Sequence, residues 1–352
     1  MQAHPDSPAL PTVPFGTTGM RITRVGFGSW ALGGGDWADG WGDQDDRDSV
    51  AAIQHALARG VNWIDTAAIY GLGRSEGVVA RALRGTVPSE KPYVFTKCGL
   101  IGDKRDPKAQ PKGIGAPASL RKELENSLRR LEVERIDLYQ MHWPPRDGTP
   151  IEVYWQTLLD FKAEGKIRAA GLSNHSVAQL AAAEAIGHVD TLQPPFSAIH
   201  REAAAREIPW CEQHDTGVIV YSPMQSGLLS GAFTRARADS LPANDWRSHS
   251  PEFQDHLERN LQVAAALERI GERRGVATAS VAVAWTLAWR GVSAAIVGAR
   301  SAKQVDGWIG AARLDLSDAE MREVAAVIEK TGAGAGPAKP ATRTSPAAAL
   351  AV

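Results

Sequence analysis

The sequence has few of the features that mark membrane-spanning, secreted or metal-binding proteins. Only two of its 352 residues are cysteines, Cys98 and Cys211, in no CxxC or metal-ligand spacing, so we expect a reduced, cytoplasmic chain. The nine histidines form no His-x-x-x-His pair, and we expect no metal site. No apolar run reaches the roughly 20 residues that a spanning helix needs, so no membrane contact is predicted. The first residues have neither a basic head nor an apolar core, so we expect no secretory signal.

The charge and length of the chain bear on its binding partners and on its number of domains. Its 39 basic and 40 acidic residues are interspersed and leave a net charge of −1, which argues against a nucleic-acid partner. With 43% hydrophobic residues the chain can bury a sizeable core, and its length suits one barrel or two small domains. The composition leaves the oligomeric state open.

Eight short apolar segments alternate with helical patterns, at intervals of about 35 residues, as in a barrel of parallel strands. We therefore predict an α/β fold, a single (β/α)8 TIM barrel. The predicted strands span residues 25–33, 63–66, 93–97, 137–142, 167–174, 191–197, 218–223 and 294–298.

The segments outside the barrel have their own signals. Residues 13–15 and 21–23 flank a glycine-bounded turn, which predicts an N-terminal β-hairpin that could plug the bottom of the barrel. A helix over residues 318–329 would close the fold. We predict a flexible arm over residues 1–12, one domain over 13–330 and a disordered tail over 331–352, because the tail is mostly Ala, Gly and Pro.

Four polar side chains fall at the ends of three predicted strands. Asp65 and Tyr70 follow strand 63–66, Lys97 ends strand 93–97, and His142 ends strand 137–142. The carboxyl ends of barrel strands meet at the face where catalysis is built. Alone, each residue has an ordinary structural explanation as a cap, a rim residue or a core residue. Four such coincidences favour a shared site.

The chemistry of these four residues fits carbonyl reduction. A free tyrosine has a pKa of about 10, and a nearby cation lowers it. Lys97 can be that cation, Asp65 can hold it, and His142 can orient the carbonyl oxygen. The result would be a general acid beside donors aimed at a developing oxyanion. The hydride has to come from elsewhere, so a nicotinamide cofactor is implied.

Three motifs occur in order along the chain: Asp65-Thr66-Ala67-x-x-Tyr70-Gly71, Thr96-Lys97 and Gln140-x-His142-Trp143-Pro144. Together they resemble the aldo-keto reductase family, and the resemblance runs from about residue 13 to residue 328. It implies a (β/α)8 barrel without a metal and with NADPH bound in extended form. It also implies that Tyr70 is the proton donor, supported by Asp65, Lys97 and His142.

The later strand ends offer groups that suit a nicotinamide. Ser173, Asn174 and Gln193 could bind the carboxamide, and Tyr221 offers a ring to stack on. The loop after residue 221 resembles the pyrophosphate-wrapping segment of the family. The positions that the resemblance assigns to the cofactor are Ser29, Trp30, Ser173, Asn174, Gln193, Tyr221, Ser222, Met224, Gly227, Gly298, Arg300 and Gln304.

Arg300 bears on the choice of cofactor. An arginine at a helix N-terminus suits the 2′-phosphate of NADPH, although it could also be a surface residue. The sequence departs from many relatives at Ala232, where they carry a lysine, and at Gly307-Trp308, where they carry Glu-Asn. Trp308 stacking on adenine is one hypothesis, and NADH stays possible.

A small-molecule carbonyl is the expected partner. Trp30, Trp143 and either Trp37 or Trp41 would wall an uncharged pocket for small aldehydes, ketones or sugar-like carbonyls. Three alternatives stay open. They are an NAD-linked alcohol or sugar dehydrogenase, a cofactor-binding redox sensor with little turnover, and a barrel that forms a Schiff base on Lys97.

Overall fold

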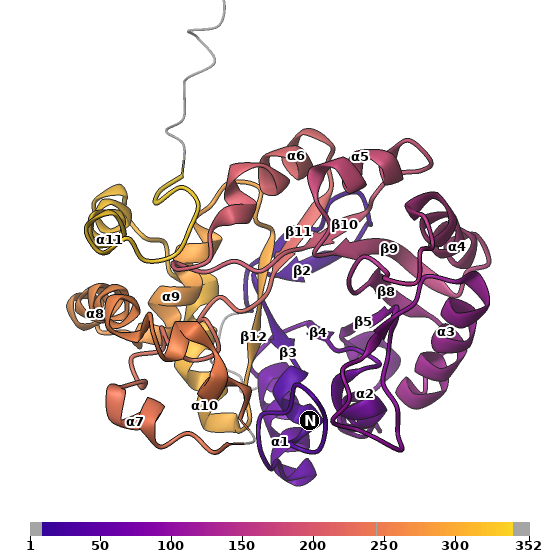
Figure 1. Cartoon of the computed structure of the whole chain (residues 1–352), viewed down its shortest axis with the longest axis horizontal. Coiled ribbons are helices and arrows are strands. Elements are labelled where there is room, and N and C mark those ends of the chain that lie inside the picture. Colours follow the sequence, from indigo (N-terminus) through magenta and orange to yellow (C-terminus); the bar gives the residue numbers. More distant parts are fainter. Residues whose placement is uncertain (1–8, 244, 341–352) are drawn as a thin grey trace, which may run out of the picture.

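The computed structural model describes residues 9–243 and 245–340 of the chain. Its centre is a closed barrel of eight parallel strands, adjacent in sequence order, with helices outside (Figure 1). The predicted (β/α)8 barrel is confirmed. The barrel strands are β3 (Val25–Gly28), β4 (Trp63–Asp65), β5 (Tyr93–Cys98), β8 (Ile136–Met141), β9 (Ile167–Ser173), β10 (Thr191–Gln193), β11 (Gly217–Val220) and β12 (Ala294–Gly298).

Most of the helices bury one stripe of residues, as an amphipathic sequence requires, whereas the helix over residues 278–287 is buried on all sides. In α3, a stripe of leucines at helical spacing places Leu120, Leu124 and Leu131 in the core, with Leu128 packed against its edge. The outer helices are α1 (Asp46–Ala58), α2 (Arg74–Leu83), α3 (Pro117–Leu131), α4 (Ile151–Ala163), α5 (Val177–Glu184), α6 (Glu207–Gln213), α7 (Arg235–Asp239), α8 (Leu257–Arg274), α9 (Thr278–Leu287), α10 (Ala302–Trp308) and α11 (Asp318–Thr331).

The N-terminal hairpin closes the bottom of the barrel. Strands β1 (Thr12–Pro14) and β2 (Arg21–Thr23) pair antiparallel, and Phe15 beyond β1 is fully buried. Its ring stacks on Phe95 inside the barrel, with 5.8 Å between the ring centroids. Gly16 has φ +50° and passes so close to the start of β11 that a Cβ would lie 2.5 Å from Gly217 N. The hairpin predicted from residues 13–23 is therefore present and serves as the plug.

Several strands end earlier than the sequence analysis predicts. The first ends at Gly28, and Trp30–Gly33 form a 3-10 turn instead. Strand β10 ends at Gln193, because the two prolines that follow cannot donate to the sheet. Strand β11 ends at Val220, two residues before Ser222 turns to φ +55°. These early ends free the following residues to form the loops at the top of the barrel.

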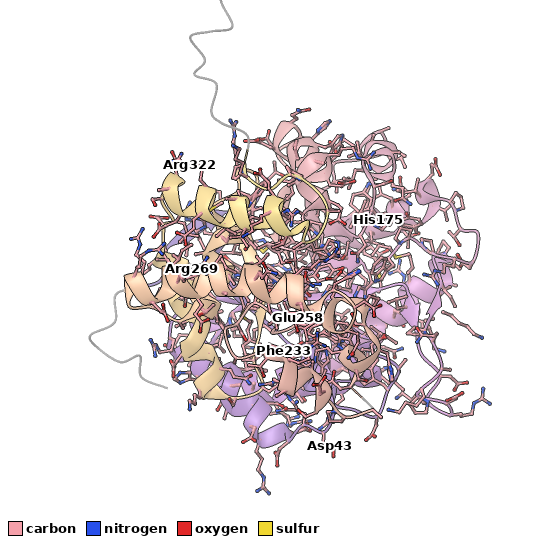
Figure 2. The ribbon with its side chains drawn as sticks, turned by 60° about the vertical axis from the view of Figure 1, so that its left-hand side comes forward. Asp43, His175, Phe233, Glu258, Arg269 and Arg322 are labelled. Atoms are coloured by element: carbon pink, nitrogen blue, oxygen red, sulfur yellow. The ribbon has the colours of Figure 1, made fainter. Side chains whose placement is uncertain are left out.

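The C-terminal part packs on the outside of the barrel. Helices α8 and α11 lie side by side (Figures 1 and 2), joined by an ion pair of 2.7 Å between Arg274 and Glu320. Beyond α11, residues 332–340 are held by buried Arg201 and are not disordered, contrary to the prediction. Its guanidinium donates to the carbonyls of Ala333 and Pro337, both at 3.1 Å. Residues 332–340 have few side chains that can interact, and they are held through their backbone carbonyls by Arg201. Residues 1–8 of the predicted arm and 341–352 of the predicted tail lie outside the described residues.

Candidate active site

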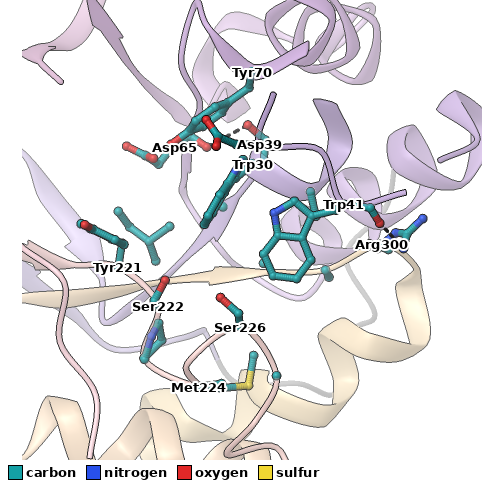
Figure 3. A pocket seen from close by; sticks show the side chains of 18 of the residues that line it. Trp30, Asp39, Trp41, Asp65, Tyr70, Tyr221, Ser222, Met224, Ser226 and Arg300 are labelled. Atoms are coloured by element: carbon teal, nitrogen blue, oxygen red, sulfur yellow. Dashed lines mark hydrogen bonds between the residues drawn. The ribbon is translucent and has the colours of Figure 1, made fainter. Parts of the chain in front are cut away.

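A cavity of about 640 Å³ opens at the carboxyl ends of the barrel strands. Figure 3 shows Asp39, Asp65 and Tyr70 close together at one side, while Arg300 lies apart from them, beside Trp41. Three of the four predicted catalytic residues line this cavity, and Lys97 lies behind them. All twelve predicted cofactor contacts line it as well: Ser29, Trp30, Ser173, Asn174, Gln193, Tyr221, Ser222, Met224, Gly227, Gly298, Arg300 and Gln304.

Asp65 and Lys97 form a buried ion pair between the ends of β4 and β5. The Lys97 ammonium donates to Asp65 Oδ1 at 2.5 Å and to the carbonyl of Thr66 at 2.9 Å. Gln193 Nε2 donates to Asp65 Oδ2 at 2.9 Å. Burial raises the pKa of Asp65 and lowers the pKa of Lys97, and the contact between the two charges opposes both shifts. The pair has a fixed geometry and leaves little net charge beside the cavity.

Tyr70 opens the short turn η2 (Tyr70–Gly73) that follows β4, and its hydroxyl lies 3.5 Å from Lys97 Nζ. Burial raises the pKa of Tyr70 well above its usual value, and the nearby acidic groups of Asp65, Tyr221 and Asp39 raise it further. The expectation that the pKa of Tyr70 lies below its usual value is therefore wrong, although the Lys97 ammonium, 3.5 Å away, still favours the phenolate. Asp65 compensates the charge of Lys97, so desolvation of the phenolate dominates. The hydroxyl keeps its proton at neutral pH and can donate it.

His142 follows β8 and meets Tyr70 edge to face, with 5.6 Å between the ring centroids. Burial and the charge of Lys97 lower the pKa of His142 well below its usual value. The imidazole is therefore neutral at neutral pH, with one donor and one acceptor nitrogen. Its backbone carbonyl accepts a hydrogen bond of 3.0 Å from Asn174 Nδ2, which ties the end of β8 to the end of β9.

Polar side chains at the ends of β9, β10 and β11 form one network. The Tyr221 hydroxyl donates to Asn174 Oδ1 at 2.8 Å, and Ser173 Oγ donates to the carbonyl of Gln193 at 2.8 Å. Asn174 has φ +63°, a conformation that asparagine tolerates better than most residues. The network fixes the amide of Asn174 and the ring of Tyr221 at the cavity wall. A nicotinamide needs such an amide-binding group and such a flat surface.

The loop after β11 curls around another part of the cavity. Ser222, Gln225, Ser226 and Gly227 all have positive φ, between +44° and +94°. Arg247 Nη1 donates to the carbonyl of Ser226 at 3.1 Å and so braces this loop. Runs of such turns bring backbone N–H groups to one side, which suits a bound anion.

Arg247 and Arg237 also line the cavity, and the sequence analysis missed both. Arg247 pairs with Asp245 at 2.6 Å, and its guanidinium lies 4.9 Å from the ring centroid of Trp41. Arg237 lies in the short helix α7 and Arg247 in a 3-10 turn, both well beyond β11, where no periodic pattern points to a site. The Asp245-x-Arg247 spacing was the only available signal. The two arginines place positive charge near Ala232, where many relatives have a lysine.

Arg300 lines the cavity beyond β12, but its guanidinium already has partners. It donates to Gln44 Oε1 at 2.6 Å, to the carbonyl of Trp41 at 3.2 Å and to that of Asp43. Gln304 accepts a hydrogen bond of 2.7 Å from the backbone N–H of Arg300. All these acceptors of the guanidinium are neutral, so they orient it without cancelling its charge. It therefore remains a suitable partner for a phosphate.

Trp308, the last residue of α10, borders the cavity, yet its side chain is packed in the core with only 1% exposed. Little of its ring is left for stacking on adenine, so the structure disfavours that hypothesis. Gly307 leaves open space beside it, since a Cβ added at this position would have nothing within 4 Å.

Aromatic rings wall the cavity near Tyr70. The ring of Trp30 stacks on Trp246 at 5.9 Å, and that of Trp37 lies 6.1 Å from Tyr70. All four tryptophans that the sequence analysis considered for the pocket wall line the cavity: Trp30, Trp37, Trp41 and Trp143.

The pocket is not uncharged, contrary to the prediction, because Asp39 lines it as well. Burial raises the pKa of this carboxyl. The loop before α1 contains several aspartates, and no pattern in the sequence indicates which one faces the cavity.

Neither a metal-binding cluster nor a membrane-spanning helix is found among the described residues. No group of three or more His, Cys, Asp or Glu among them is placed to hold a metal ion. None of their helices is long and apolar enough to cross a membrane.

Comparison with known proteins gives one consistent match. The model of the Aldo/keto reductase family matches residues 24–329. An aldo-keto reductase of Bacillus subtilis is 31% identical over 316 residues, covering 89% of this chain and 92% of that protein. The NADH-specific methylglyoxal reductase of Escherichia coli is 34% identical over 332 residues, covering 90% and 99%. Among solved structures, the glycerol dehydrogenase of Gluconobacter oxydans matches with a TM-score of 0.81 and 36% identity, covering 95% of this chain and 99% of that one.

Proposed function

Because the chain belongs to the aldo/keto reductase family, we infer that it reduces carbonyl groups with a nicotinamide cofactor. We propose that Tyr70 is the proton donor of this reaction and that its substrates are small aldehydes, ketones or sugar-like carbonyls. One observation carries this proposal. The Tyr70 hydroxyl, at the cavity wall, lies 3.5 Å from the ammonium of the buried Asp65–Lys97 pair and beside neutral His142.

The chemistry of the cavity fits a dinucleotide. Amides and hydroxyls gather at the ends of β9 to β11, and arginines line the part formed by later loops. Ser173, Asn174 and Gln193 would hold the carboxamide, and Tyr221 would support the ring. When bound, the nicotinamide supplies the hydride.

The side chains around Tyr70 have distinct roles in this proposal. As the carbonyl oxygen gains negative charge, Tyr70 donates its proton to that oxygen. The neutral imidazole of His142 can donate a second hydrogen bond and orient the oxygen. Lys97 stabilises the phenolate that remains, because its charge lies close to the oxygen. Asp65 and Gln193 keep the ammonium in place.

The pKa shifts predict how reduction depends on pH. The pKa of Tyr70 is raised, so its acid form persists to higher pH than in a free tyrosine. The pKa of His142 is lowered, so the imidazole is neutral throughout the same range. We expect kcat/KM for carbonyl reduction to be flat between about pH 6.5 and about pH 9. A fall in kcat/KM centred near neutral pH would contradict these shifts and would indicate another titrating group.

We further propose that NADPH is the preferred cofactor, because the Arg300 guanidinium lines the cavity and has only neutral acceptors. Replacing Arg300 with glutamine should weaken NADPH binding about 10- to 100-fold, the value of a charge-assisted hydrogen bond to a phosphate. NADH binding should change by less than about threefold, since NADH has no 2′-phosphate. Quenching of tryptophan fluorescence during titration with each cofactor measures both constants.

Arg300 also positions the loop before α1, so its replacement could loosen the site in general. NADH serves as the internal control for such loosening, and Arg322→Gln on exposed α11 controls for the loss of one positive charge. An equal loss of affinity for NADPH and NADH in Arg300→Gln would show that Arg300 does not contact the 2′-phosphate.

A second candidate is an NAD-linked alcohol or sugar dehydrogenase. Two relatives favour it, since one is named NADH-specific and another is named a glycerol dehydrogenase. The same side chains serve both directions, so tighter binding of NADH than of NADPH by the unmodified protein would favour this candidate.

The Schiff-base alternative has little support from the geometry. Lys97 is 1% exposed, and its ammonium is held by Asp65 and the carbonyl of Thr66. It lies behind Tyr70 and does not line the cavity.

A further inference from the structure

The loop between η1 (Trp30–Gly33) and α1 is folded into a compact, glycine-rich turn. The N–H of Gly40 donates to the carbonyl of Trp37 at 3.2 Å, and the N–H of Trp41 donates to that of Gly34 at 3.1 Å. Gly35 and Gly40 touch so closely that a Cβ on Gly40 would lie 2.7 Å from the carbonyl oxygen of Gly35. The backbone of this loop is therefore fixed before any substrate arrives.

Asp39 is the third residue of the turn that Trp37 opens and Gly40 closes. Its side chain lines the cavity and is half-buried, and Figure 3 shows it beside Tyr70 and Trp30. Within residues 9–243 and 245–340, its carboxylate has no hydrogen bond or ion pair. It is thus an acceptor without a partner, close to the hydroxyl assigned to proton donation.

Among the described residues no cation is paired with this carboxylate, and Lys108 donates to the carbonyl of Gly35 in the same loop. Lys97 is neutralised by Asp65 at 2.5 Å, and His142 is neutral. The other side chains that line this part of the cavity are apolar or aromatic: Trp30, Trp37, Ile69, Leu100 and Trp143. Of the cavity-lining arginines, Arg247 pairs with Asp245, and Arg300 is held by Gln44 and loop carbonyls, apart from Tyr70 (Figure 3). The substrate side of the cavity therefore has one unpaired negative charge.

We infer that Asp39 determines substrate class: it selects carbonyl compounds with hydroxyl groups near the carbonyl and rejects those with a carboxylate. This inference rests on the proposed function and adds the substrate class. An ionised carboxylate only accepts hydrogen bonds, and hydroxyl donors form short, charge-assisted bonds with it. A substrate carboxylate would bring a second negative charge into a partly desolvated space without a cation, which is unfavourable.

The test compares matched substrates with the unmodified protein and with Asp39→Asn, which keeps the size of the side chain but removes its charge. Glyceraldehyde and propanal share a three-carbon chain and differ in two hydroxyls. Succinic semialdehyde and butanal share a four-carbon chain and differ in one carboxylate. Asp36→Asn, at an exposed position of the same loop, is the control for loss of one charge. Thermal unfolding of all three proteins checks that they are folded.

We expect the unmodified protein to prefer glyceraldehyde over propanal in kcat/KM by about tenfold or more, and Asp39→Asn to remove most of that preference. The ratio of succinic semialdehyde to butanal should rise about tenfold or more in Asp39→Asn and stay constant in Asp36→Asn. Ratios that do not change in Asp39→Asn, with an active unmodified protein, would overturn the inference alone. An unmodified protein that reduces none of the four compounds would overturn the proposed function and this inference together.

Discussion

Replacing Tyr70 with phenylalanine is expected to lower kcat by about 10²- to 10⁴-fold, which is the usual contribution of a positioned general acid. The substitution removes one oxygen and keeps the ring. The ring contacts with Trp30, Trp37 and His142, at 6.3, 6.1 and 5.6 Å between centroids, should therefore persist. Cofactor affinity should change by less than about threefold, because the proton is needed only as the oxyanion forms. Steady-state kinetics and a cofactor titration separate the two effects.

Tyr154 offers a matched control for this experiment. It is a buried residue of α4, and its hydroxyl is hydrogen-bonded at 2.9 Å to His175, just beyond β9. Tyr154→Phe also deletes a buried phenol oxygen, but one that does not line the cavity. It should lower stability without a large change in kcat. Equal losses of activity in Tyr70→Phe and Tyr154→Phe would contradict the assignment of Tyr70 as the proton donor.

The second large effect is expected when Lys97 is replaced with methionine. The substitution leaves the Asp65 carboxylate buried at 3% exposure without its cation. Breaking a buried pair in this way costs about 3–5 kcal/mol of stability. Activity should fall as well, by about 10² or more, because no charge remains to stabilise the phenolate of Tyr70. Urea unfolding and steady-state kinetics measure the two losses.

The stability loss should depend on pH in a defined direction. Burial raises the pKa of Asp65, and losing Lys97 removes the main opposing contact. A group whose pKa is raised in the folded state binds protons more readily there than in the unfolded state, so stability falls as pH rises. Lys97→Met should therefore be less destabilised at about pH 5 than at about pH 8. A larger loss at the lower pH would contradict this assignment.

Two further variants separate the structural role of Lys97 from its catalytic role. Adding Asp65→Asn to Lys97→Met removes the unpaired charge and should recover part of the stability but none of the activity. Lys162→Met breaks another lysine pair, at 2.7 Å from the buried carboxylate of Asp190 and away from the cavity. It should lower stability and leave kcat unchanged. A loss of activity in Lys162→Met as large as in Lys97→Met would indicate that instability alone explains the effect.

The sequence was sufficient to predict the parts of the site that follow from barrel topology. Asp65, Lys97 and His142 each stand at or just after a strand end, and parallel strands in a barrel leave no other place for them to meet. The same rule placed Asn174 and Gln193. Their positions depend on strand order, which the alternation of apolar segments and helices determines.

The cavity-lining residues Asp39 and Arg247, which the sequence analysis missed, lie between the barrel strands and the outer helices. Asp39 and Arg247 reach the cavity through turns whose shape depends on close glycine contacts and on pairing between distant segments. The bridge between Trp41 and Asp245, for example, joins two loops far apart in sequence. Such contacts have no period, so no pattern in the sequence distinguishes Asp39 from its neighbouring aspartates.

The direction of the Tyr70 pKa was missed for an energetic reason. The sign of the pKa shift depends on whether desolvation of the phenolate or attraction to the Lys97 charge is larger. Asp65 lies in close contact with Lys97 and weakens that attraction, so desolvation is larger. Strand positions alone do not give the distance of that contact. The composition of residues 332–340 was misleading in a related way, because their order comes from backbone carbonyls that Arg201 binds.

The most direct test of carbonyl reduction in this cavity is a single turnover with NADPH deuterated at the transferable position. The protein is loaded with one equivalent and mixed with a small aldehyde, and the absorbance of the reduced nicotinamide is followed. We predict that the cofactor is oxidised, that one alcohol forms for each NADPH consumed, and that the deuterium lies on the former carbonyl carbon. Tight binding of NADPH without oxidation by any of a range of aldehydes and ketones would contradict this function and would favour a redox-sensing protein.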